Sequence, residues 1–459
     1  MAAVQATLSL ALTLALGLPL AHLISRYEFP LRRWLSGLLL LPFLLPTVVT
    51  GLAVRQLLGP WLEPGLPMLL LAHAFVNLAV VVRLVVPVWS VLDERFAEVA
   101  AALGANRWDV ARTVWWPALR PAVLSASGIV WVYCFNSLGL LLVLGGQQRT
   151  LESVILRQVG LLLDFKAAAA TAATQLVVVS AVLLLTSRGP RGGAAFRGKS
   201  RRRQLPRPWQ WLPAAVSLLL ALPLLWLAVA SVRGSSGWTA EWWSRLLDSG
   251  SPLSSATAAA VVGQSLYTAL ISGALGAALA LAVAVAAVSG QHLIARLGLL
   301  PMGVSAVTLG LGLLLAASRW PLSALPRPAL LPIAQVAFAL PVLMAVVLPV
   351  IRSADARLLL VARSLGAGRN RALFTAYGPA LARIASASFV LAAAVSLGEY
   401  GAASFLTSAD APTLPVEIMR LLSRPGAGTL GTAAALSVVL GVVATLLFVS
   451  ADRLERATA

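Results

Sequence analysis

Two stretches of the chain, EVAAALGANRWDVARTVWWPALRP at residues 98–121 and LVARSLGAGRNRALFTAYGPALAR at residues 360–383, are copies of one polar segment. Their glycines, Gly104 and Gly366, lie 262 residues apart, and each is followed by alanine and, 13 residues after the glycine, by proline. Further identities at the same offset are Asp93/Asp355, Arg95/Arg357, Val99/Val361, Ala100/Ala362, Leu103/Leu365, Arg107/Arg369, Thr113/Thr375, Ala118/Ala380 and Leu119/Leu381. A repeat at a fixed offset indicates duplication of a structural unit.

Two weaker echoes support duplication of a whole domain. LPFLLPTVVTGLAV (41–54) resembles LPMGVSAVTLGLGL (300–313), and SLGLLLVLGG (137–146) resembles SLGEYGAASF (396–405), both at an offset of 259. The three echoes occur in the same order in both halves. We predict six helices between corresponding points, and this even number gives both copies the same orientation in a membrane.

The composition is that of a polytopic membrane protein. Of 459 residues, 59% are hydrophobic and 11% are charged, whereas about a quarter of a soluble domain is charged. The apolar runs are continuous, which favours helices of about 20 residues over alternating barrel strands. They fall near 4–24, 35–58, 67–90, 121–144, 167–186, 211–232, 260–288, 296–317, 329–352, 380–400 and 428–450. We therefore predict an all-α fold with about 11 transmembrane helices.

The net charge is +19, and the basic residues are distributed as in a membrane protein. Basic residues lie in short gaps between apolar runs, the pattern of cytoplasmic loops, so we expect no nucleic-acid partner. The stretch RGPRGGAAFRGKSRRRQLPRP (188–208) has eight basic and no acidic residues. We predict a first domain at 1–187, a flexible cytoplasmic linker at 188–210 and a second domain at 211–459. With the linker in the cytoplasm, the predicted helices place Met1 on the outer side of the membrane, with five helices before the linker and six after it. An additional N-terminal helix would make the two halves symmetric.

Each glycine-centred segment is too polar to span a bilayer. Alanines before Gly104 favour a helix, glycine permits a sharp turn with positive φ, and Pro117 is tolerated in the first turn of the following span. We predict a helix–turn–helix at the cytoplasmic surface in each half. Two such segments could dock two copies of one motor subunit.

The segment resembles the EAA loop of ABC importer permeases, E-A-A-x-x-x-G-A with a downstream proline. The first copy matches at Glu98, Ala100, Gly104, Ala105 and Pro117, with Val99 in place of the first alanine. The second copy keeps Gly366, Ala367 and Pro379, but Leu360 replaces the glutamate. The resemblance implies the type I ABC importer fold, an ABC ATPase subunit bound in two copies, an extracytoplasmic solute-binding protein, and a bacterial inner membrane.

Other stretches are similar to fused two-domain permeases for ferric iron and thiamine. They are LLAHAFVNLAVVVRL (70–84), PFLLPTVVTGLA (42–53), LGGQQRTLESVILRQ (144–158) and SLGEYGA (396–402). The resemblance implies an importer permease for one of these two cargos, with other small solutes as the alternative.

Polar residues inside apolar runs are costly and indicate transport pathways. The candidates are Asn77, Asn136, Glu399 and Tyr400. Glu399 could attract a cation and Tyr400 could add a cation–π contact. The alternatives are a helix–helix hydrogen bond for Asn77 and a hydrated interfacial position for Glu399.

The sequence predicts a transport subunit and not an enzyme. It contains no G-x-x-x-x-G-K-[ST] phosphate loop, so we expect ATP hydrolysis in a partner chain. One cysteine, Cys134, and three scattered histidines predict no metal site, and no cofactor is expected. The alternatives are a secondary, ion-coupled transporter, which should carry coupling residues in both halves, and a membrane enzyme or scaffold.

Overall fold

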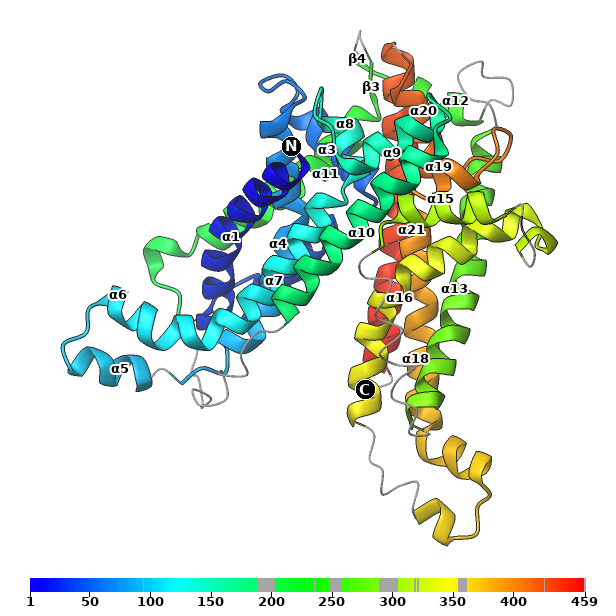
Figure 1. Cartoon of the computed structure of the whole chain (residues 1–459). Coiled ribbons are helices and arrows are strands. Elements are labelled where there is room, and N and C mark those ends of the chain that lie inside the picture. The colour runs from blue at the N-terminus through cyan, green and yellow to red at the C-terminus, as the bar shows by residue number, and fades with distance from the viewer. Residues whose placement is uncertain are drawn as a thin grey trace. The chain divides into compact units, whose positions relative to one another are not determined.

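The computed structural model describes residues 1–187, 203–247, 257–288, 304–353 and 361–457, apart from positions 94, 235–236, 318, 320–321 and 425. The chain divides into two compact units, Met1–Val229 and Ala230–Ala459. Both are built of helices (Figure 1). The described strands are two-residue pairs: β1 (Tyr27–Glu28) runs parallel to β2 (Arg203–Gln204), and β3 (Arg233–Gly234) antiparallel to β4 (Gly237–Trp238).

The helices of the first unit follow the predicted order. They are α1 (Ala2–Arg26), α2 (Arg32–Leu44), α3 (Thr47–Leu58), α4 (Leu66–Trp89), α5 (Arg95–Ala102), α6 (Arg107–Val110), a π-helical turn (Ala111–Trp115), α7 (Trp116–Phe135), α8 (Leu138–Leu144), α9 (Leu151–Gly160), α10 (Phe165–Ser187), a 3-10 turn (Arg207–Trp209) and α11 (Leu212–Ala230).

The second unit repeats much of this order. Its helices are α12 (Glu241–Leu247), α13 (Ala258–Val288), α15 (Ala306–Ala316), a 3-10 turn (Leu322–Ala324), α16 (Arg327–Ser353), α18 (Arg369–Gly398), α19 (Ala403–Leu406), α20 (Leu414–Leu422) and α21 (Ala427–Ala457).

The predicted all-α polytopic fold is confirmed. Among the described residues, eight helices are long and apolar enough to cross a membrane, or nine if the bent pair α2–α3 forms one span. Two shorter apolar helices, Ala306–Ala316 and Pro328–Leu340, overlap the two remaining predicted runs. Each of the eleven apolar runs therefore contains a helix, but not every one forms a straight span.

Two predicted spans are interrupted. The run at 35–58 is broken between α2 and α3, which lie at 106° to each other. The break occurs where Leu45, before Pro46, takes the extended backbone that proline imposes on its predecessor (φ −73°, ψ 147°). The run at 121–144 ends early, because Asn136 (φ −101°, ψ 42°) and Ser137 (φ −107°, ψ 68°) leave the helix after Phe135. The prediction of continuous helices there was wrong.

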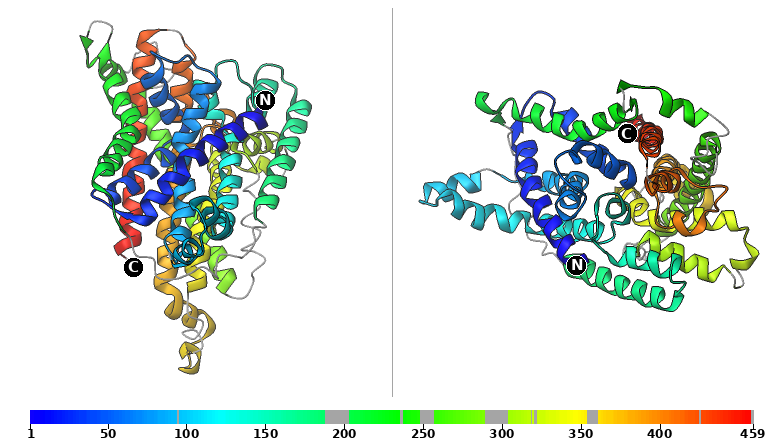
Figure 2. Two further views of the ribbon diagram at one scale, coloured as in Figure 1. Left: turned by 90° about the vertical axis from the view of Figure 1, so that its left-hand side faces the viewer. Right: turned by 90° about the horizontal axis from the view of Figure 1, so that it is seen from above.

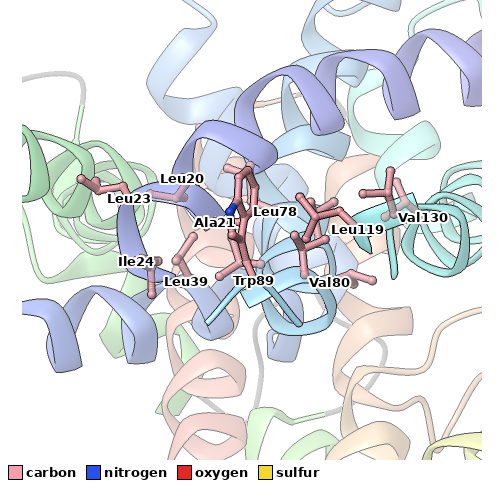
Figure 3. Close-up of a cluster of buried hydrophobic side chains, with 14 of the residues drawn as sticks. Leu20, Ala21, Leu23, Ile24, Leu39, Leu78, Val80, Trp89, Leu119 and Val130 are labelled. Carbon is pink, nitrogen blue, oxygen red and sulfur yellow. The ribbon is translucent and has the colours of Figure 1, made fainter. Parts of the chain in front are cut away.

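The core of the first unit combines α1, α2, α4 and α7 (Figure 3). Leu20 and Ala21 of α1 pack with Leu78 of α4 and Leu119 of α7. The cluster also includes Leu205, next to β2, and Leu220 of α11. For this reason the packing boundary falls at residue 229, at the end of α11, whereas the predicted linker ends at 210. Residues 188–202 of that linker lie outside the described part, and the domain limits 1–187 and 211–459 stay predictions.

Candidate functional site

The first glycine-centred segment forms a helix–turn–helix. Helix α5 ends in a turn at Gly104, whose φ of +87° is in the left-handed region that favours glycine. The turn is closed by hydrogen bonds from the Gly104 N–H to the Ala101 carbonyl and from the Ala105 N–H to the Ala100 carbonyl, each 3.0 Å. Helix α6 follows, capped by the Asn106 side chain, which accepts the Trp108 N–H at 2.8 Å.

The second copy builds the same turn with different flanking residues. Gly366 has a φ of +84°, its N–H donates to the Arg363 carbonyl at 2.9 Å, and the Ala367 N–H donates to the Ala362 carbonyl at 3.1 Å. Figures 1 and 2 show that in each unit the segment projects beyond the end of its adjoining long helix, α7 or α18. Pro117 lies in the first turn of α7, whereas Pro379 lies inside the continuous helix α18.

Both segments expose the same apolar pair one helical turn apart. In the first copy Val99 and Leu103 are 58% and 83% exposed, and in the second Val361 and Leu365 are 54% and 82% exposed. The side chain of Glu98 is also exposed and lies 3.7 Å from Arg203. Adjacent exposed apolar side chains are a feature of protein-interaction surfaces, and the docking of another protein on these two segments stays a prediction.

Two predicted pathway residues end corresponding spans. Asn136 is the residue after the last turn of α7, and Glu399 is the residue after the last turn of α18. The sequence echo at offset 259 would pair Glu399 with Leu140 instead, but the helix ends pair it with Asn136. Glu399 is 5% exposed, and its carboxylate oxygens accept the N–H groups of Ala402 and Ala403 at 2.7 and 3.1 Å. Its visible role is therefore to cap the short helix α19.

In each unit two short helices pack closely against each other: α3 against α8 in the first unit and α15 against α19 in the second. A Cβ on Gly51 of α3 would lie 3.2 Å from Val143 of α8, and a Cβ on Gly310 of α15 would lie 2.7 Å from the Ala402 backbone. Across each contact lies a second glycine, Gly139 or Gly401, against Thr47 and Val307 respectively. Glycines thus allow the close approach of α3 to α8 and of α15 to α19.

Asn77 belongs to a buried polar tie between helices. Its amide donates to the His73 carbonyl at 2.9 Å and contacts the Cys134 Sγ of α7 at 3.6 Å. The His73 Nδ1 lies 2.9 Å from both the Gln5 Nε2 and the Ser9 Oγ of α1. Because an amide nitrogen can only donate, Nδ1 is the acceptor. This arrangement supports the interpretation of Asn77 as a helix–helix contact.

The second unit has the equivalent tie with different residues. Gln335 lies 262 residues after His73, and its Oε1 accepts the hydroxyls of Ser272 (2.9 Å) and Ser396 (2.6 Å). Its Nε2 donates to the Ser396 carbonyl at 3.2 Å. Ser396 stands 262 residues after Cys134. A buried polar group therefore joins α1, α4 and α7 in the first unit, and another joins the corresponding helices α13, α16 and α18 in the second.

Sequence reasoning missed three buried polar residues, two of them between predicted apolar runs and one, Gln175, inside the run at 167–186. Glu152, Gln175 and Glu417 are 2%, 1% and 1% exposed. Glu152 and Glu417 lie on the short amphipathic helices α9 and α20, which begin after Thr150 and Thr413. The signal was the shared pattern T-L-x-x-x-I-x-R at 150–157 and 413–420. No group of three metal-binding side chains occurs among the described residues.

The four pathway candidates do not form one cluster within either unit. Asn77 and Asn136 lie on different helices of the first unit, and Asn136 is joined to Gln175 instead. Tyr400 directly follows Glu399, but its ring is partly buried against an apolar cluster that includes Leu331. A shared contact of these residues with a cargo stays a prediction.

Comparison with known proteins identifies the family. Residues 13–190 match the model of the binding-protein-dependent transport system inner membrane component. The thiamine transport system permease protein of Brucella abortus is 28% identical over 98% of this chain and 86% of its own length. The thiamine permease of Haemophilus influenzae is 30% identical over 40% of this chain and 38% of its own. The sulfate transport system permease protein CysT of Escherichia coli is 31% identical over 37% of this chain and 67% of its own. The chain belongs to the binding-protein-dependent ABC permeases of the bacterial inner membrane.

Proposed function

We propose that the protein is the membrane subunit of an importer in which two copies of a separate ATPase subunit bind the segments around Gly104 and Gly366. The observation that carries this proposal is the matched surface of the two copies. The same turn, with nearly the same φ, presents a valine and a leucine of nearly the same exposure in each half. One ATPase surface could therefore bind both segments, although only the first carries Glu98.

In this mechanism the energy of ATP reaches the spans through continuous backbone. Helix α18 begins at Arg369, directly after the second turn, and runs to Gly398. Helices α6 and α7 are joined by a π-helical turn in the first unit. A movement of either segment would thus displace the long span and its polar end, at Asn136 or Glu399. A solute-binding protein on the outer side would deliver the cargo.

We infer that the cargo is thiamine. The Brucella thiamine permease aligns with nearly the whole chain, both halves included, whereas the sulfate permease aligns with 37% of it. The chemistry of the interior supports a cation over a dianion, because the carboxyl groups of Glu152 on α9 and Glu399 at the end of α18 are buried. The third buried carboxylate, Glu417, is paired with Arg420 at 3.6 Å. Buried carboxyl groups disfavour a nearby anion by like-charge repulsion. Ferric iron, the other cargo that the sequence resemblance implies, is also a cation.

Uptake in a defined system tests both parts of the proposal. Proteoliposomes would contain the permease with its ATPase and binding protein, and uptake of radiolabelled thiamine, ferric iron and sulfate would be compared with and without ATP. ATP-dependent uptake of thiamine alone is the expected result. Uptake of iron or sulfate instead would replace the proposed cargo. Uptake driven by an ion gradient without ATP would contradict the ATPase-coupled mechanism.

A further inference from the structure

A buried amide, that of Gln175, lies in the middle of α10 in the first unit. Helix α10 is mostly exposed at its surface, but Ala168, Ala172, Gln175 and Val179 form a buried stripe along one face. The other three members are small or apolar, as expected for a helix that packs on its neighbours. Gln175 interrupts this stripe, and a polar group there needs hydrogen-bonding partners.

The amide of Gln175 is held by two neighbouring elements. Its Nε2 donates to the Asn136 Oδ1 at the end of α7, at 2.8 Å, and to the Glu152 Oε1 of α9, at 3.4 Å. Because a carboxylate oxygen can only accept, these contacts fix which side of the amide is nitrogen. Both N–H groups are thereby used. The Gln175 Oε1, in contrast, is buried and has no hydrogen-bonding partner among the described residues.

A buried carbonyl oxygen without a donor is unfavourable, and a ligand that supplies an N–H group removes this cost. The oxygens that meet here, Oε1 of Gln175, Oδ1 of Asn136 and the carboxyl of Glu152, are all acceptors. We propose that Asn136, Glu152 and Gln175 form a cargo-binding site for the N–H-bearing group of an organic cation. This inference rests on the proposed function and specifies which residues recognise the cargo during passage.

The last helix of the second unit, α21, also buries a polar side chain. Ser437 lies 262 residues after Gln175, on α21, and is fully buried with an Oγ that also lacks a partner among the described residues. At the helix end of the second unit, the carboxylate of Glu399 already accepts two backbone N–H groups. Helices α10 and α21 thus each bury one polar side chain with an unpartnered oxygen among the described residues. The acceptor-rich version, with an amide oxygen beside a carboxyl group, occurs in the first unit, and we assign the recognition of the cation to that unit.

The test compares Glu152→Gln and Gln175→Leu with a control in the same helix pair. Thr171 of α10 donates to the Oε1 of Gln158 on α9 at 3.1 Å, so Thr171→Val removes an α9–α10 hydrogen bond without touching the site. In proteoliposomes with the partner proteins, thiamine uptake should fall at least about tenfold in both site variants, as for a lost hydrogen bond to a charged group. Uptake by Thr171→Val should stay close to wild type. ATPase stimulation by the loaded binding protein should survive in all three.

Each other outcome has a defined meaning. Wild-type-like uptake in either site variant would overturn the proposal, since the unpaired oxygen would then face water only. An equal loss in the control variant would also overturn it, because the cluster would merely hold α9 against α10. If Glu152→Gln does not assemble, Gln175→Leu alone decides. A wild-type complex that carries sulfate and not thiamine would refute the proposed cargo and this cation site together, and that result is recognisable before any variant is measured.

Discussion

The two turn glycines offer the sharpest test of the coupling mechanism. Alanine at position 104 or 366 would have to adopt a φ of +87° or +84°. The space is open, because a Cβ added at either glycine would have no heavy atom within 4 Å. The penalty is therefore purely conformational, about 1–2 kcal/mol for each residue held in the left-handed region.

This penalty translates into a population of correctly formed turns. A cost of 1–2 kcal/mol reduces the ratio of formed to unformed turn by a factor of about 5–30. The two turns lie in separate parts of the chain, so their costs should add to about 2–4 kcal/mol in the double variant Gly104→Ala/Gly366→Ala. Asparagine tolerates the left-handed region better than alanine, so Asn at both positions should restore part of the coupling.

The assay measures three quantities on one preparation: ATP-dependent uptake, ATPase activity stimulated by the binding protein, and the amount of ATPase retained on the purified permease. The double alanine variant should lose uptake and retained ATPase together, while its spans stay folded. Gly368→Ala is the matched control, since Gly368 lies in the same exposed segment at a φ of −59°, which alanine adopts freely. Full uptake with both alanines present and the ATPase bound would refute the role of these turns.

Three further predictions concern packing and capping, and each is measured by thermal unfolding in detergent and by uptake. Thr150→Ala should cost about 0.5–2 kcal/mol because the Thr150 hydroxyl caps α9 in a capping box, whereas Thr413→Ala should cost less because Thr413 makes no side-chain cap; equal losses would contradict this difference. His73→Gln should keep the polar tie, as the amide of the second unit does, whereas His73→Leu should lose about 0.6–1.7 kcal/mol, the range for hydrogen bonds between membrane helices. Gly276→Ala should destabilise the α13–α18 packing by about 1–3 kcal/mol, since its Cβ would lie 2.5 Å from the Ala392 Cβ, while Gly263→Ala meets no atom within 4 Å and should be neutral.

The features predicted best from the sequence are those in which a residue type determines the local backbone, as glycine does at a turn with positive φ. The repeated Gly104 and Gly366 identified turns that both adopt positive φ, and the apolar runs identified helices in both units. The helix breaks were not predictable in this way. Residues 121–144 are apolar throughout apart from a few small polar side chains, so hydropathy alone gives no reason for α7 to end at Phe135.

Buried polar contacts escaped sequence reasoning for a different reason. His73 and Gln335 occupy equivalent places but share no chemistry that an identity comparison detects. Gln175 and Glu152 lie 23 residues apart on separate helices, and only the packing of α9 on α10 brings them together. A pattern search along one chain finds neither relation, because each depends on which faces of two helices meet.

The contrast between the two copies suggests what duplication has kept and what it has allowed to change. A tight turn between two short helices has few solutions, and both copies retain glycine with the same exposed valine and leucine. If one ATPase surface binds both segments, neither can change alone without losing that partner. The polar positions along the spans are under no such constraint: Asn136 follows α7 where Glu399 follows α18, and His73 corresponds to Gln335 in the polar tie. A single cargo molecule without internal symmetry presents different groups to the two halves. Under the proposed function, recognition of such a cargo would favour divergence at these positions, whereas binding of two identical ATPase subunits would favour identity at the turns.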